Sequence, residues 1–207
     1  MASGLVESTG SRRSQDRIRG LVFVAAMLAV MWLVEIVDQV FNANLDADGI
    51  RPHDAAGLDG IVFAPFLHAG FGHLLSNTVP FLVLGVVIAL SGLRRVILVT
   101  VIVAVIAGLG VWLFAPSGTD HIGASGVVFG YAAYLIARGL FSRSGLHLVT
   151  GAVVVAVWGG TLLSDLVPRD GISWQGHLFG AVGGVVAAWL LNRRAQPARG
   201  RVADIAG

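Results

Sequence analysis

The chain has 207 residues, of which 56% are hydrophobic and 13% charged, with a mean hydropathy of +0.81, and these values exclude an ordinary water-soluble domain. All fourteen basic residues are arginines at the ends of apolar runs, a pattern typical of membrane anchoring rather than of a nucleic-acid groove. The absence of cysteine excludes disulfides, thiolate nucleophiles and thiolate metal sites.

The chain begins with a polar segment, rich in Ser and Arg, that predicts a disordered tail over residues 1–18. Runs long enough to cross a bilayer, which takes about 20 apolar residues, follow at 20–40, 73–91, 94–114, 125–141, 146–164 and 172–192. The first run is longer than a signal-peptide core and no cleavage site follows it, so we expect a retained helix. The prediction is an all-α polytopic membrane protein with six transmembrane helices in residues 19–193 and a second cytoplasmic tail over 194–207.

The arginines predict how these six helices are oriented. An even number of spans returns both termini to one side of the membrane, and twelve of the fourteen arginines fall on that side. Only Arg51 and Arg169 fall on the other. The positive-inside rule therefore predicts a plasma-membrane protein with both termini in the cytoplasm and a long outer loop over 41–72.

Three polar residues on different predicted helices lie at a similar depth. Counting 1.5 Å per residue from the inner arginines places Ser125, His177 and Asn77 about 20 to 26 Å from the inner face, within a hydrocarbon core of about 30 Å. The helix of Ser125 would then begin inside the membrane, after the irregular segment "SGTDHIG". Such backbone is tolerated only where it is buried in protein or lines a water-filled cavity.

These residue types suit nucleophilic catalysis. A serine needs a general base, usually an imidazole, and His177 is the only histidine of the second half of the chain that lies away from the very end of a predicted span. At a helix N-terminus, Ser125 would meet unpaired N–H groups that stabilise an oxyanion. His73 and Asn77, four residues apart in "HLLSN", share a helix face and would add further donors.

The glycines in "GASGVVFG" allow a structural interpretation as well. Gly126 and Gly130 have the spacing of small residues that let membrane helices approach closely, and Ser125 would then add only an interhelical hydrogen bond. The predicted helix of His177 has its own glycines, at 176, 180, 183 and 184. Close approach of these two helices would also bring His177 within reach of Ser125, so packing and catalysis are compatible.

Other kinds of site receive less support from the sequence. A zinc site of His68, His73 and His177 has no HExxH motif and no carboxylate nearby, so we expect no metal. A transporter is disfavoured because the spans lack charged residues at the midplane and matching broken helices. The remaining ionisable candidates are expected in loops or at helix ends, in contact with solvent: His53, His121, His147, Glu35, Asp38, Asp120 and Asp165. The predicted site is thus a serine–histidine dyad without a carboxylate.

The motifs "HLLSN", "GASGVVFG" and "GHLFGAVGG", in this order in a six-span chain, resemble the rhomboid intramembrane serine proteases over about residues 20–192. The resemblance implies a rhomboid-like bundle in which Ser125 is the nucleophile and His177 the general base. It assigns the oxyanion to Asn77, His73 and the Ser125 amide, and interhelical packing to Gly180 and Gly184. It also implies cofactor-free hydrolysis of single-span membrane proteins, in or near their membrane segments, through an acyl-enzyme.

The chain departs from the family pattern at two places. Many members have tyrosine four residues after the serine, where this chain has Phe129, and a Trp-Arg pair in the first outer loop, where it has "GIRP" with Arg51. The resemblance implies sideways substrate entry, with the fifth helix and the 165–172 loop as moving parts. The alternative is an inactive relative that binds or escorts membrane proteins, which the retention of Ser125 and His177 disfavours.

Overall fold

The protein is described by a computed structural model that gives the backbone of residues 2–193 and the side chains of residues 10–192. Six helices in this range are long and apolar enough to span a membrane: α1 (Ala2–Phe41), α3 (Phe71–Ala89), α4 (Leu93–Phe114), α5 (Ser125–Ser142), α6 (Gly145–Ser164) and α7 (Trp174–Arg193). The described range has no β-strand, only an isolated bridge between Ile50 and His121. The prediction of an all-α, six-span membrane protein is confirmed, while the predicted tail over 194–207 lies outside the described residues.

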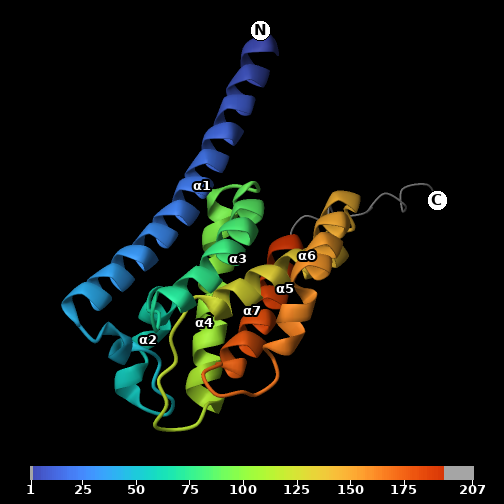
Figure 1. Cartoon of the computed structure of the whole chain (residues 1–207). Helices are drawn as coiled ribbons and strands as arrows, with labels where there is room; N and C mark the ends of the chain where they lie inside the picture. The colour runs from blue at the N-terminus through green and yellow to red at the C-terminus, as the bar shows by residue number, and fades with distance from the viewer. Residues whose placement is uncertain (1, 194–207) are drawn as a thin grey trace.

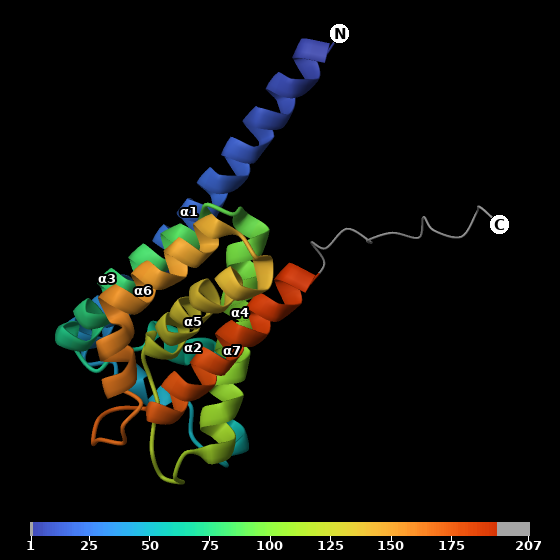
Figure 2. The same cartoon turned by 90° about the vertical axis from the view of Figure 1, so that its right-hand side faces the viewer.

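α1 is longer than the sequence predicts. Residues 2–18, expected to be a disordered tail, continue the helix, and this end of α1 projects beyond the bundle (Figures 1 and 2). The side chains of residues 10–19 are exposed, so tertiary packing does not hold this part. Adding a turn to an existing helix avoids the cost of nucleation, and this segment contains no proline to stop it.

The predicted long outer loop folds as a compact cap on one end of the bundle. It contains four short helical turns, η1 (Leu45–Asp48), η2 (Ala55–Gly57), α2 (Gly60–Phe63) and η3 (Ala64–Phe66). Arg51 holds three parts of this loop together: Nε donates to Asp54 Oδ2 (3.1 Å), Nη1 to Ala47 O (3.0 Å) and Nη2 to Ala56 O (2.9 Å). The arginine of "GIRP" therefore orders the loop from within.

α5 lies at the centre of the bundle and packs most extensively on α7. The two backbones nearly touch, because a Cβ on Gly180 would overlap the main-chain oxygen of Gly126, and one on Gly184 would overlap that of Gly130. This contact confirms the predicted packing of the two glycine-containing helices. Gly183 points elsewhere, since its Cβ would lie 3.0 Å from Val103 Cα on α4.

α6 is the least enclosed of the six long helices. It packs on α5, where Gly139 of α5 lies close to the α6 backbone at His147 and Gly151 of α6 lies close to the α5 backbone at Ile136. It has no comparable contact with α3 among the described residues. The face of the bundle between α3 and α6 is therefore only loosely closed.

Candidate active site

Ser125 is the first residue of α5, as the apolar run over 125–141 predicts. The chain leaves the end of α4 and returns into the bundle as irregular backbone before α5 begins (Figure 1). Gly123 makes this approach possible: its φ is +109°, and a Cβ there would lie 2.7 Å from His73 Cε1. Only glycine fits such a position without strain.

His177, on the first turn of α7, is hydrogen-bonded to Ser125. The distance from His177 Nε2 to Ser125 Oγ is 2.9 Å, and the histidine is only 6% exposed. Its other ring nitrogen, Nδ1, lies 2.8 Å from the main-chain oxygen of Asp165. Because a carbonyl only accepts hydrogen bonds, Nδ1 carries the proton and Nε2 is left to accept from the serine hydroxyl.

Phe129 fixes the plane of the His177 ring. The two ring centroids are 4.1 Å apart and the planes differ by 4°, so the rings are stacked. Phe129 lies one turn after Ser125 on α5, on the side that faces α7. The imidazole is therefore held by a ring on its face and a carbonyl at its edge.

His73 and Asn77, on α3, place two further donors beside Ser125. Asn77 Nδ2 donates one hydrogen to His73 O (3.1 Å), which leaves the second hydrogen of the amide for another acceptor. His73 Nδ1 accepts from the Ala69 N–H (3.4 Å), so the ring proton lies on Nε2, against Gly123. The structure thus brings together all four site residues predicted from the sequence.

These four residues line a cavity of about 880 Å³. Its remaining walls come from α3, α6 and the loops before α5 and α7, including Pro80, Trp158 and Leu162. This volume is large enough for water and a short peptide segment, and the cavity lies between α3 and α6. The irregular backbone before α5 needs a water-filled cavity or surrounding protein to satisfy its polar groups, and this cavity meets that need.

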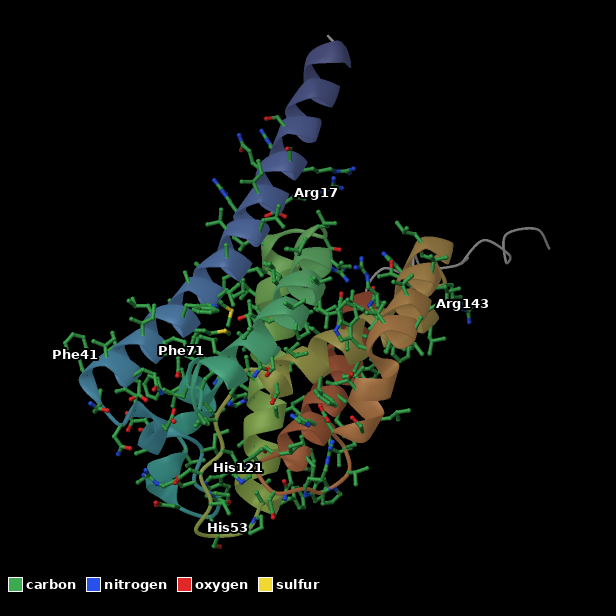
Figure 3. All side chains as sticks on the ribbon, in the orientation of Figure 1. Arg17, Phe41, His53, Phe71, His121 and Arg143 are labelled. Carbon is green, nitrogen blue, oxygen red and sulfur yellow. The ribbon has the colours of Figure 1, made fainter. Side chains whose placement is uncertain are left out.

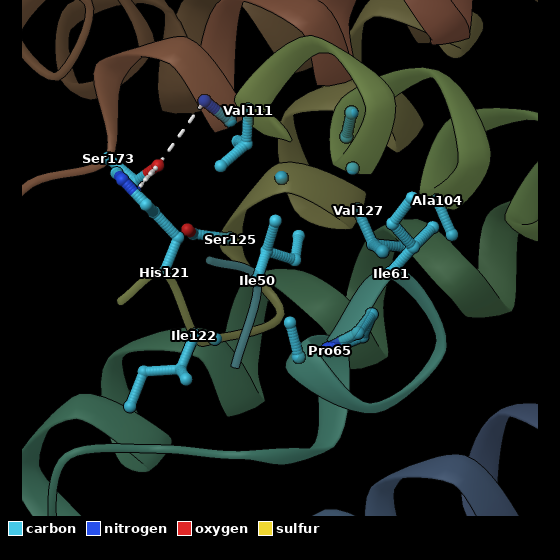
Figure 4. Close-up of a pocket in the computed structure, with 16 residues that line it drawn as sticks. Ile50, Ile61, Pro65, Ala104, Val111, His121, Ile122, Ser125, Val127 and Ser173 are labelled. Carbon is cyan, nitrogen blue, oxygen red and sulfur yellow. Dashed lines mark hydrogen bonds between the residues drawn. The ribbon is translucent and has the colours of Figure 1, made fainter. Parts of the chain in front are cut away.

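A second, smaller cavity of about 40 Å³ lies on the other side of Ser125 (Figure 4). Ile50, Ile61 and Val111 form its apolar part. Its polar edge is the pair His121 and Ser173, whose Nδ1 and Oγ lie 2.7 Å apart. This pair links the loop before α5 to the loop before α7, and so braces the two helices that carry Ser125 and His177.

His121 corrects an expectation, because the sequence places it in solvated loop. Its second nitrogen, Nε2, lies 2.9 Å from Thr119 Oγ1, so both ring nitrogens are satisfied within the protein. Burial lowers the pKa of His121, an effect that the nearby Asp120 carboxylate opposes. The ring is held because the bridge between Ile50 and His121 draws this loop under the outer cap.

Glu35 and Asp38 are also tied into the protein more closely than expected. Glu35 is 1% exposed, and Asp38 Oδ1 accepts from the Leu45 N–H (2.7 Å). The chain folds back at this point, and the start of the outer loop covers the end of α1. The burial of Glu35 depends on this reversal of the chain, which the sequence pattern does not predict.

The three histidines of the zinc alternative make different contacts. His68 is 1% exposed and accepts a hydrogen bond at Nε2 from the Ala124 N–H (3.4 Å), directly before Ser125. Its ring meets that of His73 edge-on, at 5.1 Å between centroids. Burial lowers the pKa of His68 to about 4, with a smaller contribution from His73. Within the described residues, no three potential ligands are grouped to hold a metal ion.

The sequence also misses the role of Asp165. Its side chain lies beside solvent, as expected, and accepts from Arg169 Nη2 (2.8 Å). Its main-chain oxygen, however, is the group that holds His177. No side-chain pattern predicts a carbonyl contact, because every residue carries the same carbonyl group.

Comparison with known proteins agrees with the motifs. A family model described as Rhomboid domain matches residues 56–194, which include all four site residues. The uncharacterized protein Rv1337 of Mycobacterium tuberculosis is 48% identical over 184 residues, covering 85% of this chain and 77% of the relative. The uncharacterized protein ML1171 of Mycobacterium leprae is 44% identical over 194 residues, with coverages of 90% and 76%. "Putative rhomboid protease YdcA" of Bacillus subtilis is 26% identical over 175 residues, with coverages of 82% and 87%.

Proposed function

The chain belongs to the rhomboid family, and on this premise we propose that it is an intramembrane serine endopeptidase that cleaves membrane-spanning proteins in or near their transmembrane segments. Ser125 is the nucleophile and His177 the general base. The observation that carries this proposal is the 2.9 Å hydrogen bond between Ser125 Oγ and His177 Nε2 at the edge of a cavity of about 880 Å³. A packing serine needs no such cavity.

The first chemical step forms an ester with Ser125. His177 Nε2 takes the hydroxyl proton as Oγ attacks the peptide carbonyl, and the carbonyl oxygen becomes an oxyanion. The main-chain N–H of Ser125, the Nε2–H of His73 and the free hydrogen of the Asn77 amide would stabilise this oxyanion. The protonated His177 then gives its proton to the leaving amine, and the C–N bond breaks.

The second step consumes water. His177 Nε2 takes a proton from a water molecule in the cavity, and the resulting hydroxide attacks the ester carbonyl. The ester bond breaks, Ser125 Oγ recovers the proton from His177, and a carboxylic acid is released. The Asp165 carbonyl and the Phe129 ring keep the imidazole in one tautomer and one plane throughout. These contacts replace the carboxylate of a triad, and no cofactor takes part.

Substrate entry follows from the open side of the bundle. The cavity is lined by α3 on one side and α6 on the other, two helices without extensive mutual contact. A transmembrane segment that unwinds near its end would pass between them from the lipid. α6 and the loop over residues 165–172 would move, because α6 is the least enclosed long helix.

The proposed setting is the plasma membrane, with both termini in the cytoplasm. The distribution of arginines supports this orientation, since the end of the bundle that carries Arg143 lies opposite the one that carries His53 and His121 (Figure 3). The proposed partners are membrane-spanning substrates and the lipid bilayer. The cavity containing Ser125 would then open toward the outer half of the membrane.

A cleavage assay tests this function. The full chain is reconstituted in proteoliposomes with labelled single-span substrates and compared with Ser125→Ala and His177→Ala. We expect each variant to lose activity by roughly a thousandfold or more, because the nucleophile and base act as a unit. Equal cleavage by wild type and both variants would contradict the proposal. Binding of the same substrates without cleavage by any of the proteins would support the inactive, escorting relative instead.

A further inference from the structure

At the end of the bundle opposite the candidate active site, two arginines contact Tyr134, and His147 lies beside one of them. Arg95 Nη1 donates to the Tyr134 hydroxyl (2.9 Å) and to Asn192 Oδ1 (3.3 Å). The Arg138 guanidinium lies over the Tyr134 ring, 6.0 Å from its centroid, and Nη1 donates to Ser91 Oγ (2.9 Å). His147, at the start of α6, pairs its Nδ1 with Ser142 Oγ (2.8 Å), one turn after Arg138 on α5.

This basic cluster of Arg95, Arg138 and His147 has no carboxylate partner among the described side chains. Every acceptor that the two guanidiniums reach is neutral, and Arg138 Nε is buried without an acceptor. The one acidic side chain described at this end is Asp16, which lies against Gly92 and forms no ion pair with either arginine. Like charges held together without a counter-charge are unfavourable where hydrocarbon limits screening.

One helix N-terminus adds to the positive potential here. α6 begins at Gly145 without a side chain that caps its first turn, whereas the start of α4 already has the Asp16 carboxylate against Gly92. The free N–H groups and macrodipole of α6 favour an anion at this end of the bundle. The cluster is thus built from five elements: the α3–α4 turn, α4, α5, α6 and α7.

We infer that this cluster binds the phosphate of an anionic phospholipid from the adjacent membrane leaflet. A phosphate oxygen supplies the acceptors that the two guanidinium forks lack, and Arg recognises phosphate in a bidentate manner. Lipid headgroups are the phosphates always present at the end of a membrane helix, and basic pockets between such helices recognise them. The bound phosphate would tie α4 to α5 and α6, and so stabilise the bundle from the end remote from Ser125.

Nanodiscs of defined composition test the inference without any need for proteolysis. The protein is placed in phosphatidylcholine alone or with a fixed fraction of phosphatidylglycerol, and its Tm and retained lipid are measured, the latter by native mass spectrometry. We expect phosphatidylglycerol to raise Tm by roughly 5 °C and to remain bound after detergent extraction. A separate sample in phosphatidylcholine receives inorganic phosphate, and an equal Tm rise there would assign the site to free phosphate and overturn the lipid.

The variants are matched for charge. Arg95→Gln with Arg138→Gln removes the cluster, while Arg94→Gln with Arg143→Gln removes the same charge from exposed positions at the same end. We expect the first pair to lower lipid retention about tenfold or more and the second to leave it unchanged. Equal losses in both pairs would mean diffuse surface attraction, and unchanged retention in the first pair would mean no site; either result overturns the inference. The single variant Arg138→Lys keeps the charge but loses the bidentate guanidinium group. Its lipid retention provides the test should the double variant not fold.

Discussion

At the scale of the residue, the candidate site depends on how a histidine is oriented without a carboxylate. His177 is fixed by the main-chain oxygen of Asp165 at 2.8 Å and by the ring of Phe129 at 4.1 Å. Both contacts are uncharged, which suits a buried site, since a third ionised group would need its own solvation or a partner there. The Asp165 side chain stays outside, paired with Arg169.

Phe129→Ala tests the stacked ring. Without it the imidazole gains freedom about its side-chain bonds, so we expect kcat to fall by up to about tenfold with little change in KM. Phe129→Tyr keeps the ring and serves as the matched control, with kcat close to that of wild type. Steady-state cleavage in proteoliposomes measures both constants, and an unchanged kcat in Phe129→Ala would show that the stacking has no part in orientation.

His68 gives the fold a predictable dependence on pH. Its pKa is lowered from the ordinary 6.5 to about 4 by burial, so the unfolded chain takes up the proton first as pH falls. Stability is therefore full above about pH 6.5 and is lost between there and pH 4, by at most about 3 kcal/mol. Tm measured at neutral pH and near pH 5 in the same detergent should fall less in His68→Gln than in wild type. An equal fall in both proteins would rule His68 out as the cause.

At the scale of the element, the contact between α5 and α7 sets the distance from Ser125 to His177. Gly180 has no room for a Cβ, because the main-chain oxygen of Gly126 occupies that space. Neither backbone can rotate away as a flexible side chain would. The glycines that pack the helices are thus also the residues that place Ser125 beside His177.

Gly180→Ala should separate these helices and lower activity by about a hundredfold, since small misplacements of reacting groups are costly. Gly160→Ala is the control, because its Cβ would meet no atom within 4 Å on α6. That variant should keep full activity and gain about 1 kcal/mol in helix propensity. Cleavage rates and Tm values of the two proteins provide the comparison, and a fully active Gly180→Ala would contradict the proposed role of the contact.

The helices could be predicted from the sequence because apolar length and arginine position are local properties. Even the start of α5 at Ser125 followed from the apolar run over 125–141. The buried positions of Glu35 and His68 and the half-buried position of His121 could not be predicted, since each depends on the outer loop folding back over the bundle. The contact between the Asp165 carbonyl and His177 could not be predicted either, because it does not depend on the side chain at position 165.

At the scale of the whole molecule, the two ends of the bundle differ in charge and construction. One end has the cavity, the candidate dyad and the ordered loops, and the other has the basic cluster. The projecting part of α1 lies at this second end (Figure 1). Such asymmetry suits a protein that works from one leaflet and is anchored in the other.

The absence of cysteine allows the sidedness to be measured directly. Gly145→Cys and Asp170→Cys each introduce one exposed thiol, at opposite ends of α6. A membrane-impermeant maleimide should label Asp170→Cys in intact cells and Gly145→Cys only after permeabilisation, because the proposed topology places the arginine-rich end in the cytoplasm. The reverse pattern of labelling would invert the proposed topology.

The central claim is that His177 makes Ser125 a nucleophile. Reaction of the reconstituted protein with a fluorophosphonate probe, followed by mass spectrometry of the labelled peptide, tests this most directly and needs no known substrate. The account predicts a single adduct on Ser125 that is absent in Ser125→Ala and reduced by roughly a hundredfold or more in His177→Ala. An unlabelled Ser125 in a folded protein, or equal labelling with and without His177, would contradict it.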